Sequence, residues 1–116
     1  MRYLFILNDS PYGSQRTYTG LRLALNLMRS PANVVHVFLI GDGVTAAFEG
    51  FTPAHAYYST QDMLRQVGAR GGRIGVCKTC LEARGILDQH LVPEAKRATL
   101  DDLTEWTEEA DKVLTF

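Results

Sequence analysis

The sequence contains the apolar stretch Val34-Val35-His36-Val37-Phe38-Leu39-Ile40, which stops at the turn Gly41-Asp42-Gly43. Apolar side chains occupy both alternating faces of this stretch, and His36 is the exception. A strand of this kind is buried on both sides, as happens when helices cover both faces of a parallel sheet. We therefore predict a central strand of an α/β fold, in which His36 is a hydrogen-bonded core residue.

Other segments alternate along the chain in the order that such a fold requires. Further strands are predicted over residues 2–7, 73–76 and 112–116. Helices are predicted over residues 15–29 and 78–84, and after two capping pairs, Ser59 with Asp62 and Thr99 with Asp102. Strands that alternate with helices form parallel β-α-β units. The expected architecture is a three-layer α/β sandwich, one domain over residues 1–116, with a mostly parallel, flavodoxin-like sheet of about five strands.

The composition restricts the classes of partner. The 116 residues are 46% hydrophobic and 22% charged, as in an ordinary globular protein, and the formal net charge is −1. That charge gives no field to attract nucleic acid or an anionic membrane. No stretch approaches the roughly 20 apolar residues that span a bilayer, and the N-terminal apolar run is too short for a signal peptide. We therefore expect a cytoplasmic protein with no direct nucleic-acid partner and no membrane partner.

The segment Val76-Cys77-Lys78-Thr79-Cys80 contains both cysteines of the chain. Cys77 is predicted where a strand ends and a helix begins, so its sulfur faces the free N–H groups of the first helical turn. Their partial positive charge, with Lys78 and Arg84 nearby, favours a thiolate and a lowered thiol pKa. Cys77 is therefore the predicted nucleophile, which attacks a sulfur donor or carries a persulfide.

Cys80 follows three residues later, which places both side chains on one edge of a helix start. The two thiols are then close enough for a disulfide or a shared persulfide. A structural zinc needs four ligands, and the three histidines show no matching spacing, so we predict no metal and no cofactor. Two alternatives stay open: both cysteines are buried core residues, or they only sense oxidation.

Loops at the carboxyl ends of parallel strands form the site in sheets of this kind. We therefore expect the loops after the first and the central strand to lie beside Cys77, although their residues are also typical of ordinary turns. Residues 50–58 and 86–93 lack a clear period and are predicted as loops, and the first of these is the candidate for controlling access to the thiol. The predicted binding residues are Tyr12, Gly13, Gln15, Gly41, Gly43, Lys78 and Arg84.

Four segments resemble the DsrE/DsrF-like family, which includes the TusD-type subunits of sulfur relay systems and the homo-oligomeric YchN-like proteins. Together the segments span nearly the whole chain in the family's order. The most specific feature is a cysteine followed eight residues later by glycine, with arginine directly before that glycine. The segments are Ser10-Pro11-Tyr12-Gly13-Ser14-Gln15, Val37-Phe38 leading to Gly43-Val44, the Cys77 segment ending Arg84-Gly85-Ile86, and Asp111-Lys112-Val113-Leu114-Thr115-Phe116.

The resemblance implies that Cys77, by its position in the motif, accepts a persulfide sulfur from a donor protein and passes it to an acceptor. It also implies a parallel α/β sheet and assembly as a homo-oligomer, a trimer or hexamer, with the cysteine near subunit contacts. Cys80 departs from the TusD-type pattern and is frequent in the YchN-like branch, to which the sequence looks closer.

Two functions are therefore predicted for the cysteine pair. The first is a sulfur carrier or sulfurtransferase, in which Cys77 holds the persulfide and Cys80 resolves it as a disulfide. The alternative is a small-molecule-binding or redox-sensing homo-oligomer whose Cys77/Cys80 pair is oxidised but transfers no sulfur.

Overall fold

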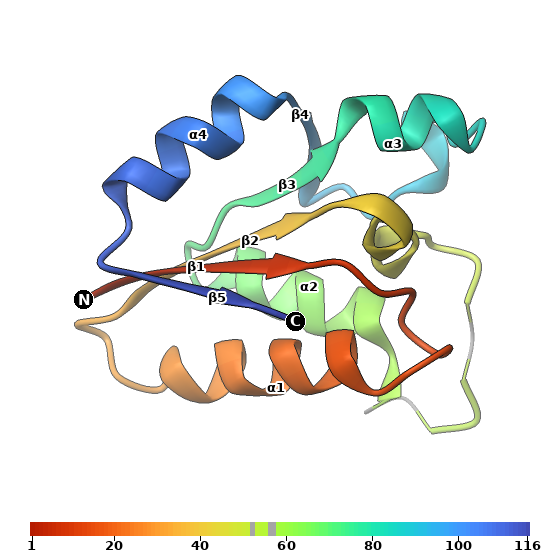
Figure 1. The fold of residues 1–116 in the computed structure, drawn as a ribbon. Coiled ribbons are helices and arrows are strands. Elements are labelled where there is room, and N and C mark those ends of the chain that lie inside the picture. The colour runs from red at the N-terminus through yellow and green to blue at the C-terminus, as the bar shows by residue number, and fades with distance from the viewer. Residues whose placement is uncertain (52, 56–57) are drawn as a thin grey trace.

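The computed structural model describes residues 1–51, 53–55 and 58–116, and strands and helices alternate along it (Figure 1). The strands predicted near both termini, at the centre and before Cys77 are confirmed, as are the helices. No helix in the described part of the chain is long and apolar enough to cross a bilayer. The elements are β1 (Arg2–Leu7), α1 (Arg16–Leu27), β2 (Val34–Leu39), the 3₁₀ helix η1 (Gly41–Ala47), α2 (Thr60–Ala69), β3 (Ile74–Cys77), α3 (Lys78–Ala83), the 3₁₀ helix η3 (Asp88–His90), β4 (Ala95–Ala98), α4 (Leu100–Glu109) and β5 (Lys112–Thr115).

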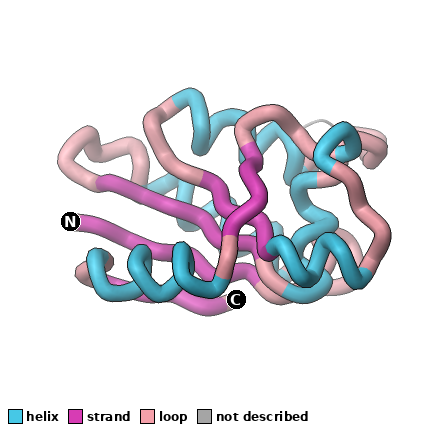
Figure 2. Tube along the Cα trace, turned by 90° about the horizontal axis from the view of Figure 1, so that it is seen from above, coloured by secondary structure: helices cyan, strands magenta, loops and turns pink. Residues whose placement is uncertain are grey.

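The five strands form one sheet in the order β4-β3-β2-β1-β5, and every neighbouring pair is parallel. Helices α1 and α2 cover one face and α4 covers the other, which confirms the three-layer α/β fold with β2 at its centre (Figure 1). The order differs from the 2-1-3-4-5 order of flavodoxin itself, because here β1 lies between β2 and β5. Seen from above, the two termini lie at opposite ends of these neighbouring strands (Figure 2).

Strand β4 is an element that the sequence does not predict. The prediction places a loop over residues 86–93 and no strand between this loop and the helix that follows Thr99, whereas η3 forms within that range and Ala95–Ala98 pairs with β3. The segment reads Ala-Lys-Arg-Ala, which is poor in the β-branched and aromatic residues that favour strands. Backbone pairing at the edge of the sheet, with Cys77 opposite Ala98, therefore makes this strand.

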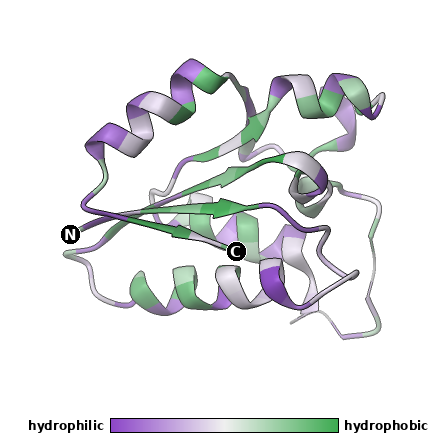
Figure 3. Cartoon of the chain, viewed as in Figure 1, coloured by the Kyte–Doolittle hydropathy of each residue, from purple (hydrophilic) through white to green (hydrophobic). Residues whose placement is uncertain are grey.

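The core has two layers, one on each face of the sheet. The larger one lies between the sheet and helices α1 and α2, and includes the fully buried Phe5, Leu21 and Leu64. The smaller one lies under α4, where Leu4 and Phe38 meet the partly buried Leu103 and Trp106. Hydrophobic residues accordingly concentrate on the strands and the inner sides of the helices (Figure 3). Cys77 packs against both clusters, so it lies where the two layers meet.

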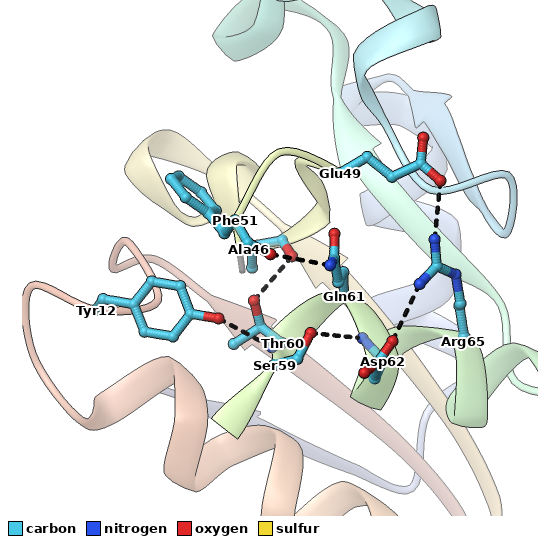
Figure 4. Close-up of polar contacts among 9 residues, drawn as sticks. All are labelled: Tyr12, Ala46, Glu49, Phe51, Ser59, Thr60, Gln61, Asp62 and Arg65. Carbon is cyan, nitrogen blue, oxygen red and sulfur yellow. Dashed lines mark hydrogen bonds and ion pairs between the residues drawn. The ribbon is translucent and has the colours of Figure 1, made fainter. Parts of the chain in front are cut away.

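Both predicted capping pairs begin helices. Asp62 donates its backbone N–H to Ser59 Oγ at 3.3 Å, and Asp102 donates its own to Thr99 Oγ1 at 3.2 Å. The start of α2 is also tied to two other segments, because Thr60 Oγ1 donates to the Ala46 carbonyl at 3.0 Å and Thr60 N donates to the Tyr12 hydroxyl at 3.3 Å (Figure 4). These bonds fix α2 against the segments that follow β1 and β2.

Gly43 lies where the segment after β2 packs closely on the end of β1. A Cβ at this position would lie 2.1 Å from the Leu7 carbonyl oxygen, a backbone atom, and Gly43 N–H already donates to the Asn8 carbonyl at 2.9 Å. We expect Gly43→Ala to lower the free energy of unfolding in urea by about 1–3 kcal/mol, as overpacking does. Gly71→Ala is the control, because Gly71 has open space around it and a φ of 88°, so only strain of about 1 kcal/mol is expected. Equal losses in the two variants would contradict this packing.

Candidate functional site

Cys77 is the last residue of β3 and the residue that caps α3. Its Sγ accepts the backbone N–H of Cys80 at 3.4 Å and lies 3.4 Å from the Thr79 hydroxyl oxygen. Both cysteines are free and partly buried, with neither in the fully buried core. The strand-to-helix junction predicted for Cys77 is therefore present, and it surrounds the sulfur with donors.

These donors decide the ionisation of Cys77. Burial raises the pKa of the Cys77 thiol, but hydrogen bonds from the side chain of Cys80 and from Thr79, with their backbone N–H groups, outweigh burial and bring the pKa below its ordinary value. A hydrogen bond to the charged form of a group favours that form. Cys77 is thus the thiol of the pair that ionises first.

Cys80 has the opposite character. Burial and its hydrogen bond to Cys77 raise the pKa of Cys80, and the Gly41 N–H, which donates to Cys80 Sγ at 3.2 Å, opposes them only in part. Cys80 is therefore the thiol of the pair that keeps its proton longer and can donate it toward the Cys77 sulfur. The two cysteines thus differ in acidity.

The segment after β2 supplies this contact with Cys80. Gly41 has a φ of 59°, a left-handed conformation that favours glycine. Arg84 binds Asp42 at 2.7 Å and also donates to the Cys80 carbonyl at 3.0 Å, so it links α3 to this segment. Gly43 packs on β1, as described above. The predicted proximity of the residue 41–43 turn to the cysteine pair is confirmed, and Arg84 joins them.

A cavity of about 330 Å³ lies beside the two sulfurs. Its wall is mostly apolar, and Lys78 is the cation among the described residues that line it. The sequence does not predict the part of the cavity wall that β2 and the start of α4 contribute. The spacing of Leu100 and Leu103 indicates that α4 has an apolar side, but it does not indicate what that side packs against. The lining residues are Phe38, Ile40, Cys77, Lys78, Thr79, Cys80, Ala98, Thr99, Leu100 and Leu103.

Tyr12, Gly13 and Gln15 line a different cavity, of about 320 Å³, together with Tyr18 and Tyr58. The Tyr12 hydroxyl donates to the Tyr58 carbonyl at 3.2 Å, and the Tyr12 ring meets Phe51 edge to face. The residues predicted from sequence as one site therefore fall into two groups, and only one of them contains the cysteines.

The loop over residues 50–58 was predicted to control access to the thiol. Residues 52, 56 and 57 of this loop lie outside the described part of the chain. None of its described residues lines the cavity beside Cys77.

His36 is hydrogen-bonded, as predicted, but it is partly buried and lies outside the hydrophobic core. Its Nδ1 accepts the Arg73 backbone N–H at 2.9 Å, and its ring lies 5.5 Å from that of Trp106. Burial, followed by the charge of Arg73, lowers the pKa of His36, which keeps the ring neutral and able to accept. Within residues 1–51, 53–55 and 58–116, no three His, Cys, Asp or Glu side chains gather closely enough to hold a metal ion.

The fold and the site define a small parallel α/β protein with a cysteine pair at the carboxyl end of a strand. The model of the DsrE/DsrF-like family matches residues 1–116, and the chain belongs to this family.

Individual relatives agree with this assignment. The chain is 38% identical to protein YchN of Escherichia coli K12 over 116 residues, which cover 99% of this chain and 98% of YchN. The crystal structure of the E. coli ychN protein matches the whole of both chains with a TM-score of 0.90 at 37% identity. A Vibrio vulnificus YJ016 protein named sulfurtransferase TusD homolog is 27% identical over 128 residues, covering 100% of this chain and 98% of that protein. The chain is thus more similar to YchN than to this TusD homolog, as the sequence predicts.

The hydrogen bonds at Cys77 predict a measurable pH dependence. Thr79→Val and Cys80→Ala each remove a side-chain donor that lowers the pKa of Cys77, so we expect that pKa to rise and alkylation by iodoacetamide at pH 7 to slow severalfold. The measurement is the alkylation rate of Cys77 against pH, followed by peptide mass spectrometry.

Thr79→Ser is the control for this experiment, because it keeps the hydroxyl and should keep the alkylation midpoint near that of the unmodified chain. If the pH midpoint of Cys77 alkylation were unchanged in both Thr79→Val and Cys80→Ala, that result would contradict the role assigned to these donors.

Proposed function

We propose that this protein is a sulfur carrier, with sulfurtransferase activity, that takes sulfane sulfur as a persulfide on Cys77 and passes it to an acceptor. The observation that carries the proposal is the Cys77 sulfur itself, which accepts the Cys80 backbone N–H and lies 3.4 Å from the Thr79 hydroxyl oxygen at the end of β3. Membership of the DsrE/DsrF-like family and similarity to a protein named sulfurtransferase support it.

The loading step is a displacement at sulfur. The Cys77 thiolate attacks the outer sulfur of a donor persulfide R–S–SH, so that a bond forms between Cys77 Sγ and that sulfur while the donor S–S bond breaks. The donor leaves as the thiolate R–S⁻ with the bonding electron pair, and the transferred sulfur keeps its proton. A low pKa at Cys77 favours this step at neutral pH because the thiolate is the nucleophile.

The donor N–H and hydroxyl groups also suit the product. A persulfide is more acidic than a thiol, and its inner sulfur, Cys77 Sγ, keeps its place beside these donors after loading. The mostly apolar cavity beside Cys77 has room for the added outer sulfur. Unloading repeats the displacement, with an acceptor thiolate attacking the outer sulfur and Cys77 leaving as the thiolate.

This function requires partner proteins that give and receive sulfur. Cys77 is only partly buried and lines an open cavity, which offers an acceptor thiol a route to its sulfur. We further propose a homo-oligomer, a trimer or hexamer, acting in the cytoplasm as a single-domain protein over residues 1–116. Its binding residues would be Lys78 and Arg84 beside the cysteines, with Gly41 and Gly43 shaping the loop.

Cys80 has a proposed role after loading. Its thiol contacts Cys77 Sγ, the inner sulfur of the persulfide, whereas the outer sulfur extends beyond this contact. Attack by the Cys80 thiolate on the inner sulfur forms the Cys77–Cys80 disulfide and expels the outer sulfur as hydrosulfide, HS⁻. No external oxidant is needed, since the sulfane sulfur is reduced as the two cysteines are oxidised. A reducing thiol must then regenerate the pair.

The second candidate function is a redox-sensing or small-molecule-binding homo-oligomer. The observation that favours it is the same contact between the two cysteines, which permits a disulfide once an external oxidant removes two electrons. The cavity lined by Tyr12 and Gln15 would then be its ligand site. This candidate predicts a Cys77–Cys80 disulfide under mild oxidant and no transfer of sulfur to any acceptor.

Persulfide loading distinguishes the two candidates. After incubation with a low-molecular-weight persulfide, the intact chain should gain the mass of one sulfur atom, and peptide mapping should place it on Cys77. Cys80→Ser should load as well, because it keeps Cys77, while Cys77→Ser should not load. Equal loading of Cys77→Ser, or no loading of either the unmodified chain or Cys80→Ser, would remove the carrier proposal.

The proposed role of Cys80 predicts release of sulfide from the loaded protein. Because the pKa of Cys80 is raised, its thiolate fraction is small at neutral pH and grows about tenfold per pH unit below that pKa, so release should speed up as pH rises. Sulfide detection on loaded protein between pH 6 and pH 9 measures this. Loaded Cys80→Ser should keep its persulfide over the same range, and release at an unchanged rate from this variant would exclude the role.

A further inference from the structure

We propose that the groove between α1 and α2 is a docking site for an acidic segment of a partner protein. This groove, which we call the arginine groove, has a volume of about 590 Å³ and lies on the face of the sheet opposite α4 (Figure 1). It plays no part in the chemistry assigned to Cys77. Its lining residues are Thr19, Arg22, Leu23, Leu25, Asn26, Arg29, Met63 and Arg70.

The pairing of the arginines singles out this groove. The chain has nine arginines, and five of them form ion pairs with carboxylates. Among the described residues the remaining four have no such pair, and three of those four line the arginine groove. No Asp or Glu is among its lining residues, and α1 itself contains no acidic residue. Positive charge is therefore concentrated here on a chain whose net charge is −1.

Local contacts hold the three guanidinium groups in place without neutralising them. Arg70 donates to the Leu25 carbonyl at 3.2 Å, Arg29 donates to Asn26 Oδ1 at 3.4 Å, and Arg22 lies 5.9 Å from the centre of the Tyr18 ring. A guanidinium has five N–H donors, so each of these contacts leaves donors for a carboxylate. All three side chains are exposed.

The spacing and the floor of the groove favour a peptide segment. Arg22 lies on α1, and Arg29 lies two residues past its last residue, roughly two helical turns further along the axis. On a polyproline II segment, side chains three residues apart lie on one face and are separated by about 9 Å, so such a segment can present carboxylates to both arginines. Between the arginines, the floor of the groove is formed by Leu23, Leu25 and Met63. An apolar floor favours a ligand with apolar side chains over one made of phosphates.

A nucleic acid or polyphosphate fits the groove less well. Long polyanions need many cations along their path, whereas this chain as a whole carries more acidic than basic residues, with a formal net charge of −1. Arginine and tyrosine are frequent in protein interfaces, and a neighbouring hollow continues the groove past Tyr18 through shared residues Thr19, Arg22 and Met63. These features together suit an acidic segment with apolar side chains between its carboxylates.

A second copy of this chain is the competing occupant. Helix α4 carries five acidic residues and no basic one, and it lies on the opposite face of the sheet (Figure 1). Two of these carboxylates are already engaged, because Asp102 caps its own helix and Glu109 pairs with Arg73. If a second copy occupied the groove, removal of the groove arginines would dissociate an oligomer.

The test uses a fluorescein-labelled dodecapeptide with Glu at every third position and Leu beside each Glu, titrated with the whole protein by fluorescence anisotropy. The groove variant carries Arg22→Gln, Arg29→Gln and Arg70→Gln. The matched control carries Arg2→Gln, Lys96→Gln and Lys112→Gln, which remove the same charge from exposed sites outside the groove. We expect saturable binding that the groove variant weakens about tenfold and the control leaves unchanged.

Several results would overturn the proposal. The first three are no binding of the peptide, an equal loss of affinity in the control variant, and unchanged binding when Gln replaces every Glu of the peptide. The fourth is tighter binding of a 12-nucleotide single-stranded RNA, or of polyphosphate, than of the peptide, provided that the groove variant also weakens that binding. Dissociation of an oligomer by the groove variant, seen by sedimentation, would assign the groove to a second copy.

Two controls keep this result separate from the proposed sulfur chemistry. An Arg22→Lys, Arg29→Lys, Arg70→Lys variant preserves charge and should retain part of the binding, which excludes a mere loss of folding. Cys77→Ser should bind the peptide unchanged, and the groove variant should still load persulfide on Cys77.

Discussion

The chemistry proposed for this protein depends on the hydrogen bonds between Cys80 and the Cys77 sulfur. Both thiols lose solvation through burial, which raises the pKa of each, yet the two shifts end in opposite directions. A hydrogen bond has a direction, and here Cys77 accepts while Cys80 donates. The asymmetry gives two chemically identical side chains different acidities, as the proposed nucleophile and its partner require.

Parallel strand order places the groups that support this pair. Because β3 lies beside β2, the segment after β2 reaches α3, so Gly41 N–H meets Cys80 Sγ and Asp42 meets Arg84. The segment also packs on the end of β1 through Gly43, whose contact with the Leu7 carbonyl leaves no room for a side chain. Three strands thereby fix the position of two sulfurs.

The sequence predicts most of the fold because the signals are local. The stretch from Val34 to Ile40 is apolar on both faces, and the capping residues Ser59 and Thr99 begin their helices as expected. Strand β4 escapes prediction because its side chains do not favour a strand, and its pairing with β3 is a long-range backbone effect.

The candidate site is predictable only in part, for the same reason. The position of Cys77 between strand and helix follows from its neighbours in sequence, and so does its proximity to the turn at residues 41–43. The apolar cavity does not, because α4 contributes Leu100 and Leu103 from beyond β4. The separate location of Tyr12 also depends on tertiary contacts, above all those with Phe51 and the start of α2 (Figure 4).

The chain is similar to YchN and, more distantly, to a TusD homolog. The central claim about its function is that it transfers sulfur. A chase with labelled sulfur tests it most directly. Protein loaded from a donor persulfide labelled in its outer sulfur should carry the label on Cys77 and give it up to an added acceptor thiol, with the label recovered as acceptor persulfide. Label that never appears on Cys77, or that stays on the protein in excess acceptor, would contradict a carrier function.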